Sequence, residues 1–141
     1  MKLTTLLLLL LMTAATLSNP HDSEKELFVT LTSGDAQTQM MAMVLATQSA
    51  NQGVSVRILL CSKAGKLAIK GAESTEFAPA NKSPKQLLMG LIDRGVTVEV
   101  CGIFLPNNAY TTEDLTDKIG VASPPEIAAY MNRESVKLFT F

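Results

Sequence analysis

Two cysteines, Cys61 and Cys101, are the residues of this sequence best suited to covalent chemistry. Each ends an apolar segment, at 54–61 and 96–101, that has the composition of a β-strand. A cysteine becomes a nucleophile as its thiolate, which nearby cations favour and apolar burial disfavours. Cys101 therefore has three candidate roles: a small hydrophobic residue at a strand end, half of a disulfide, or a reactive thiol.

The other residue types exclude several kinds of catalytic site. His21 is the only histidine and precedes the first expected strand, so a Cys–His pair of the hydrolase kind is not expected. Histidine and cysteine are also too few for a metal site, and we expect neither a metal nor another cofactor. Met40, Met41 and Met43 have helical spacing, which favours packing in a core or a subunit contact over metal binding.

The elements that would position the thiols alternate between strands and helices, which predicts a parallel sheet with helical crossovers. The expected strands are 26–33, 54–61, 96–101 and 136–141. The expected helices are 36–52 and 84–94, with two short ones within 111–120 and 123–132. Residues 62–82 are expected to form a loop with at most one helical turn, and 104–110 a connection. We therefore predict an α/β fold: a three-layer α/β/α sandwich, flavodoxin- or Rossmann-like, with a mostly parallel sheet of four to five strands.

Two of the expected helices begin with capping signals. Asp35 precedes the first helix and can accept hydrogen bonds from its free N–H groups. Ser83, Pro84 and Gln86 form a capping-box pattern with proline in the first helical position. A glycine follows each of these two helices, as is typical of a helix end.

Ligands of open α/β sheets bind beyond the carboxyl ends of the strands. We therefore predict a ligand-binding rim at this edge, where Lys63, Lys66 and Lys70 add positive charge and Gly102 leaves the approach to Cys101 open. The alternative for these lysines is that they belong to a solvated loop. The alternative for the segment TSGD at 32–35 is that it forms only a turn and a helix cap. Besides Cys101 and Cys61, the predicted rim residues are Ser33, Gly34, Asp35, Lys63 and Gly102.

Each cysteine lies on the polar-facing side of its strand, because Arg57 shares the parity of Cys61 and Glu99 that of Cys101. The segments GVSVR and GVTVE, at 53–57 and 95–99, share a short sequence pattern, called the echo below. If the two strands are neighbours in the register of this echo, Leu59 rather than Cys61 faces Cys101. A disulfide would then be out of reach, since its Cα atoms must lie within roughly 7 Å.

The N-terminus has the features of a cleavable export signal. Lys2 is followed by an apolar run at 6–12 and by small residues at 13–18. An uncleaved membrane anchor is the alternative, but the run is shorter than the roughly 20 residues that span a bilayer. We predict a signal peptide over 1–20, a single domain over 24–141, a periplasmic or secreted location, and no membrane attachment once the signal is removed.

The charge of the chain argues against a nucleic-acid partner. Lys and Arg number 12 and Asp and Glu 13, which gives a formal net charge of −1. Binding to phosphate backbones requires clustered positive charge, so we expect no nucleic acid among the partners.

Several segments together resemble one known family. They cover roughly 26–141 and are ELFVTLTSGD, the helix with MAMVLA, GVSVRILLC, SPKQLLMGLIDRGV and VEVCGIFL. These segments resemble the DsrE/DsrF-like sulfur-relay family. The resemblance implies a three-layer α/β domain that assembles into homo-oligomers, as trimers or hexamers.

The resemblance also implies a chemistry for Cys101. In sulfur-transferring members a cysteine near the end of this strand carries sulfur as a persulfide, and Cys101 holds the matching position, with Cys61 as a second thiol. The expected partners are small sulfur species or a protein with an acceptor thiol. Two alternatives stay open: a noncatalytic oligomeric module that binds a small ligand and has inert cysteines, and a thiol–disulfide redox protein. The absence of a C-x-x-C pair disfavours the redox protein.

Overall fold

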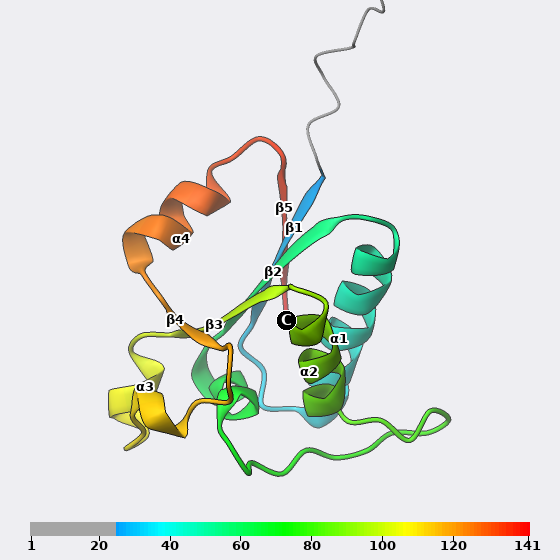
Figure 1. Ribbon diagram of the computed structural model, residues 1–141, viewed down its shortest axis with the longest axis vertical. Helices are drawn as coiled ribbons and strands as arrows, with labels where there is room; N and C mark the ends of the chain where they lie inside the picture. Colours follow the sequence, from blue (N-terminus) through cyan, green and yellow to red (C-terminus); the bar gives the residue numbers. More distant parts are fainter. Residues whose placement is uncertain (1–24) are drawn as a thin grey trace, which may run out of the picture.

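The computed structural model describes residues 25–141 (Figure 1). The predicted signal peptide over 1–20 and His21 lie outside the described residues. The strands are β1 Glu26–Leu31, β2 Ser55–Leu60, β3 Thr97–Cys101, β4 Gly120–Ala122 and β5 Val136–Thr140. The helices are α1 Ala36–Asn51, α2 Pro84–Asp93, α3 Phe104–Asn107 and α4 Pro124–Met131, with 3₁₀ helices η1 Ser62–Ala68 and η2 Thr112–Asp114.

The five strands form one sheet in the order β4-β3-β2-β1-β5, and every neighbouring pair is parallel. Helices lie on both of its faces. In Figure 1, α1 and α2 stand side by side on one side of the sheet, and α4 lies apart from them, connected to β4. The predicted α/β sandwich with a parallel sheet is confirmed, and the sheet has five strands.

The capping residues fold as predicted. The Asp35 side chain accepts a hydrogen bond from the Thr38 N–H at 2.8 Å and begins α1. The Ser83 hydroxyl accepts from the Gln86 N–H at 3.2 Å, and the Gln86 side chain accepts from the Ser83 N–H at 2.8 Å. These reciprocal bonds satisfy N–H groups that the first turn of α2 would otherwise leave without a partner.

The two faces of the sheet carry hydrophobic clusters of different size. Side chains of alternate parity point to opposite faces, so Val29 and Phe28 belong to different clusters. The cluster under α1, α2 and η1 is large and aliphatic. It buries side chains from β1, β2 and β3 as well as from the helices, for example Ile58 of β2 and Leu88 of α2, both at 0% exposure. The cluster under α4 has only four buried members: Phe28, Leu59, Ala122 and Ile127.

Three expectations for the irregular segments were wrong. The expected loop at 62–82 begins with seven residues of 3₁₀ helix, η1, and several of its side chains join the core. Gly65 makes this packing possible, because a Cβ there would lie 2.5 Å from the ring of Phe104. The expected connection at 104–110 includes one turn of helix, α3.

The third correction concerns residues 111–120, where a short helix was expected. Only the three residues of η2 are helical, and the chain then enters β4, a strand that was not expected. β4 pairs with β3, so that Ala122 lies opposite Cys101. A strand of three residues is too short to show alternation in the sequence, and its pairing with β3 defines it.

Candidate functional site

Cys61 and Cys101 lie side by side at the carboxyl ends of neighbouring strands. The pairs Leu59–Glu99 and Leu60–Val100 set the register of β2 and β3, and the next pair in this register is Cys61 with Cys101. Cys61 keeps an extended backbone, with φ −126° and ψ 165°. The expectation that Leu59 faces Cys101 was therefore wrong, because the strands pair two residues away from the register that the echo suggested.

Both thiols are free and half-buried. Cys61 packs against the cluster under α4, so its side chain is on the α4 face of the sheet. Burial raises the pKa of Cys61 to about 12, and the negative charge of Cys101 and a side-chain hydrogen bond with Cys101 add to the increase. Cys61 is therefore protonated at neutral pH and can donate a hydrogen bond to the sulfur of Cys101.

Arg57 and Glu99 share the parity of the cysteines and lie on the same face, nearer the other end of the strands. They form a salt bridge of 2.7 Å, with only 17% and 12% of their side-chain surfaces exposed. The Arg57 guanidinium also lies 4.8 Å from the centre of the Tyr130 ring on α4. This arginine therefore binds a carboxylate and an aromatic ring, and it helps to hold α4 against the sheet.

A second set of contacts holds the end of α4. Arg133 lies 5.3 Å from the centre of the Tyr130 ring and binds the Glu26 carboxylate at 2.7 Å. The Ser135 hydroxyl donates to the same carboxylate at 2.6 Å. Burial, followed by the charge of Glu26, raises the pKa of Tyr130. Tyr130 and Arg133 were not among the predicted site residues; Tyr130 lies in the last turn of α4, and Arg133 follows the end of that helix.

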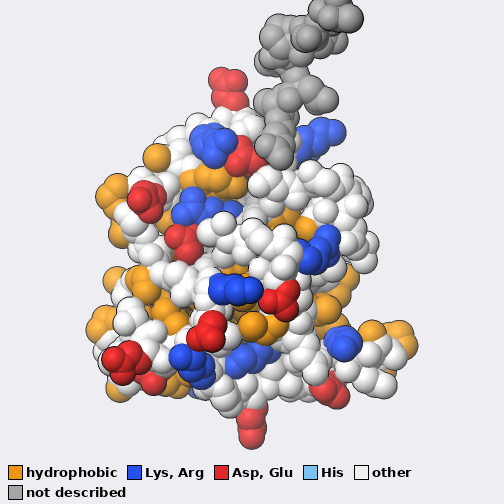
Figure 2. Space-filling model, viewed as in Figure 1, with side chains coloured by type: hydrophobic (Ala, Val, Ile, Leu, Met, Phe, Trp, Pro, Cys, Tyr) orange, Lys and Arg blue, Asp and Glu red, His pale blue; other side chains and the backbone are white. Residues whose placement is uncertain are grey.

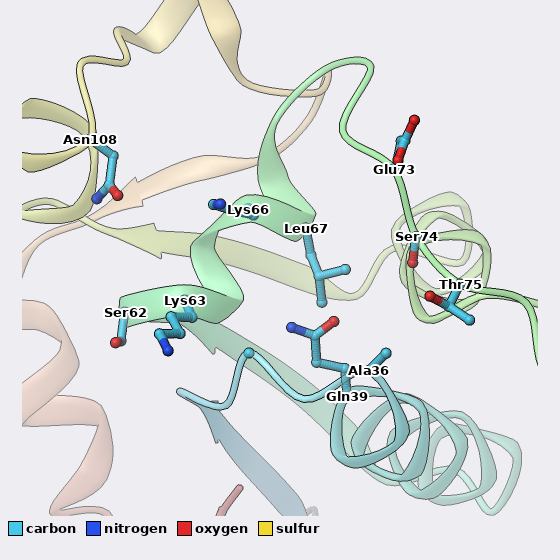
Figure 3. A pocket seen from close by; sticks show the side chains of 11 residues that line it. Ala36, Gln39, Ser62, Lys63, Lys66, Leu67, Glu73, Ser74, Thr75 and Asn108 are labelled. Carbon is cyan, nitrogen blue, oxygen red and sulfur yellow. The ribbon is translucent and has the colours of Figure 1, made fainter.

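A pocket of about 570 Å³ lies on the other side of the same sheet edge. Figure 3 shows that it is formed by η1, the start of α1 and the segment that leads to α2. Lys63 and Lys66 of η1 line it, together with Glu73, so that its charges are mixed. Neither cysteine is among its lining residues.

Two predicted rim residues meet at this pocket. A Cβ on Gly34 would lie 2.8 Å from Cβ and Cδ of Lys63, so only glycine lets the turn after β1 pack against Lys63. Lys66, one of the lysines expected to add positive charge to the rim, also lines the pocket. Ser62 and Gln39 line it as well and were not predicted. Nothing in the sequence marked Gln39 as a residue of a site.

Ser33 and Asp35 do not line the pocket; their side chains stabilise the turn between β1 and α1. The Ser33 hydroxyl accepts from the Asp35 N–H at 3.1 Å, and the Ser33 carbonyl accepts from the Gln39 side chain at 2.9 Å. The Asp35 carboxylate accepts from the N–H and the hydroxyl of Thr38, and these bonds lower its pKa. The structure thus gives this segment the alternative role of a turn and a helix cap.

Gly102 follows Cys101 and lies beside β4. A Cβ at this position would be 3.6 Å from the Ala122 carbonyl oxygen and from Cγ1 of Val121, which is ordinary van der Waals contact. The next residue, Ile103, is 72% exposed. The backbone therefore does not require glycine at position 102, and an alanine would leave the approach to Cys101 much as it is.

Within residues 25–141, no group of three or more His, Cys, Asp or Glu side chains is arranged to hold a metal ion. The helices described in this range are all too short or too polar to cross a membrane. Figure 2 shows acidic and basic side chains interspersed on the visible face rather than gathered by sign.

Comparisons with known proteins locate the fold. No protein-family model matches the chain, and no curated protein sequence matches it. Among solved structures, the YchN protein from E. coli is similar over 84% of this chain and 100% of its own, with 20% identity and a TM-score of 0.70. MTH1491 from Methanobacterium thermoautotrophicum, a protein of unknown function, covers the same shares with 14% identity and a TM-score of 0.60. At these identities the likeness shows the fold alone, and that fold is DsrE-like, as the resemblance implied.

Proposed function

We propose that this chain is an exported sulfur carrier that holds sulfane sulfur as a persulfide on Cys101. The observation that carries the proposal is the position of two free, half-buried thiols opposite each other at the carboxyl edge of a parallel sheet. This edge is where open α/β sheets bind their ligands. A pair of thiols without metal-binding neighbours within residues 25–141 is suited to exchange chemistry at sulfur.

The Cys101 thiolate would attack the outer sulfur of a low-molecular-weight persulfide. The new bond joins Sγ of Cys101 to that sulfur, the S–S bond of the donor breaks, and the donor leaves as a thiolate. An acceptor thiolate then attacks the outer sulfur on Cys101 and regenerates the free thiolate. The protonated Cys61 can donate a hydrogen bond to Cys101 before the reaction and again after transfer.

The test is intact-mass spectrometry of the full chain after treatment with inorganic polysulfide. We expect wild type and Cys61→Ser to gain sulfur, and Cys101→Ser to gain none at position 61 on the same timescale. Peptide mapping after alkylation assigns the added sulfur to one residue. If Cys101→Ser gains sulfur as readily as wild type, Cys101 is not the carrier.

The pocket supports a second candidate function, a noncatalytic module that binds a small ligand. Lys63 and Lys66 would bind an anionic group and Glu73 a cationic one, so a small zwitterion fits this lining. This function predicts that replacing both cysteines with alanine leaves ligand affinity unchanged. It also predicts that Lys66→Ala weakens binding of a carboxylate-bearing ligand, measured by calorimetry, without slowing thiol alkylation.

We propose self-association as part of this function, as trimers or hexamers in keeping with the resemblance. Large apolar side chains are exposed on α1 and on the edge strand β5, and such patches are typical of subunit contacts. Leu45 of α1 and Phe139 of β5, which are 43% and 48% exposed, line a shallow cavity of about 100 Å³ between these elements. Light scattering on the purified chain tests this: Leu45→Glu should lower the measured mass, and a monomeric wild type would contradict it.

A further inference from the structure

The directly opposed position of the two thiols allows them to react with each other. Adjacent strands of a sheet lie about 4.8 Å apart, and a disulfide joins Cα atoms about 4.4–6.8 Å apart. The Cys61 N–H donates to the Leu31 carbonyl at 2.8 Å, which continues the ladder between β1 and β2. Cys101 is fixed on its other side by its pairing with Ala122. Both backbones are therefore held in the arrangement that a disulfide between neighbouring strands needs.

We propose that Cys61 resolves the Cys101 persulfide and releases sulfide, so that the chain reduces sulfane sulfur as well as carrying it. This inference rests on the proposed persulfide of Cys101. It gives Cys61 a role that a simple carrier does not require, because transfer to an external acceptor uses one cysteine only.

The step balances without an added oxidant. Cys61 loses its proton, and its thiolate attacks Sγ of Cys101, the inner sulfur of the persulfide. A Cys61–Cys101 disulfide forms, the bond from Sγ to the outer sulfur breaks, and the electron pair leaves with that sulfur as hydrosulfide. Sulfane sulfur is reduced to sulfide while the two thiols are oxidised. A dithiol reductant must then return the disulfide to two thiols, so the reaction that follows is a thiol–disulfide exchange.

The surroundings of Cys61 decide when this step occurs. Cys61 is packed against the apolar cluster under α4 and stays protonated at neutral pH, which slows its attack. Formation of the persulfide moves negative charge from Sγ of Cys101 to the outer sulfur, farther along the side chain. The persulfide therefore has a lifetime during which an acceptor can take the sulfur, and release of sulfide follows when no acceptor is present.

The test follows sulfide release from the loaded chain after the donor is removed. The full chain is treated with inorganic polysulfide, desalted at once, and divided for sulfide trapping with bromobimane and for intact-mass measurement. We expect wild type to lose the added sulfur, release one sulfide per chain, and end two hydrogens lighter than the dithiol form. Cys61→Ser should keep the added sulfur under the same conditions, and Cys61→Ala should behave in the same way. The release rate should not depend on protein concentration, since both thiols belong to one chain.

The outcomes separate the two proposals. If wild type keeps its persulfide as long as Cys61→Ser does and forms no disulfide, the resolving role of Cys61 is wrong and the carrier role of Cys101 stands. If sulfide is released but the disulfide that forms joins two chains, the proposed step within one chain is wrong. If Cys101→Ser loads and releases sulfur like wild type, the proposed function itself fails.

Discussion

Two regions at one edge of the sheet hold the residues that the sequence marked for function, and they differ in chemistry. The thiol site, Cys61 with Cys101, is on the α4 face, beside a small apolar cluster. The lysine pocket, lined by Lys63 and Lys66, is on the face of α1 and η1 and contains neither cysteine. One region is suited to covalent chemistry at sulfur and the other to binding charged groups.

The separation of the two regions follows from the backbone after β2. Cys61 is still extended, whereas Ser62 has φ +50°, in the left-handed region, and starts η1. The chain thus turns from the sheet edge to the α1 side within one residue. Positions 61 and 63 are close in sequence, but their side chains serve different surfaces. From the sequence alone, Lys63 and Lys66 could have lain beside a cysteine thiol. In the structure they line the lysine pocket instead.

Truncation of the core should give the largest effect and show how unequal the two faces are. Leu60→Ala removes a fully buried side chain from the large cluster and should lower the free energy of unfolding by about 4 kcal/mol. Ile127→Ala, in the cluster under α4, should lower it by about 2 kcal/mol, because that cluster is small and can collapse. Urea denaturation measures both values.

The Ile127 variant also tests the role of α4 as a cover. If α4 shields the thiol site, Ile127→Ala should speed alkylation of Cys61 and Cys101 by iodoacetamide, while Leu60→Ala examined below its unfolding transition should not. Equal losses of stability for the two variants, with no change in alkylation, would contradict the distinction between the faces.

Substitution of Gly65 should give the next largest effect. A Cβ there would meet the Phe104 ring at 2.5 Å, so Gly65→Ala should lower the free energy of unfolding by about 2 kcal/mol. Gly90→Ala is the matched control in α2, because a Cβ there would meet nothing within 4 Å. This substitution should raise the free energy of unfolding by about 0.5–1 kcal/mol. Because η1 carries the lysines, only the Gly65 variant should also weaken ligand binding in the pocket. Equal effects of the two substitutions would show that η1 is not fixed by Phe104.

Removal of Cys101 should change the reactivity of Cys61 by several-fold. Cys101→Ser removes the negative charge that adds to the pKa of Cys61, which is about 12 in the wild type. The pKa should fall but stay above the ordinary value, because burial is the larger cause. The Arg57–Glu99 and Arg133–Glu26 ion pairs and the titratable Tyr130 also lie on this face, and the substitution leaves them in place.

Alkylation of Cys61 followed from neutral to alkaline pH measures this change. At each pH below the wild-type pKa, more of Cys61 is thiolate in the variant, so its rate should rise. An unchanged rate profile would show that the two thiols do not interact, and the resolving step would lose its geometric basis.

The smallest effect is expected at Asp35, in the turn beside the pocket. Its pKa is lowered by hydrogen bonds in the folded chain, so its contribution to stability is present at neutral pH. That contribution is lost as pH falls below the ordinary value of 3.8 and through the folded value. Asp35→Asn should keep the helix cap at neutral pH and reduce the loss of thermal stability in acid. A variant as acid-sensitive as wild type would exclude Asp35 as a source of that loss.

Local signals in the sequence predicted much of the fold. The cap at Asp35 and the capping box at Ser83 are interactions between residues three positions apart, and the strand patterns of β1, β2 and β3 come from alternation along one segment. The parallel order and the sandwich followed from these elements. The export signal at 1–20 stays a prediction.

The features that were missed depend on contacts between distant segments. The register of β2 with β3 is set by how the whole sheet packs, so the echo at 53–57 and 95–99 misplaced it by two residues. η1 packs against Phe104 through Gly65, and β4 is defined by its pairing with β3. The position of Cys61 opposite Cys101 depends on that register and could not be predicted from either strand alone.

The most direct test of the central claim is a crystal structure of the chain after treatment with polysulfide, compared with the untreated chain. We expect an additional sulfur atom bonded to Sγ of Cys101 on the α4 face, with Cys61 beside it, or the Cys61–Cys101 disulfide that follows its release. Unmodified thiols together with a polysulfide ion bound between Lys63 and Lys66 would contradict it, because the lysine pocket and not the thiol site would then be the functional region.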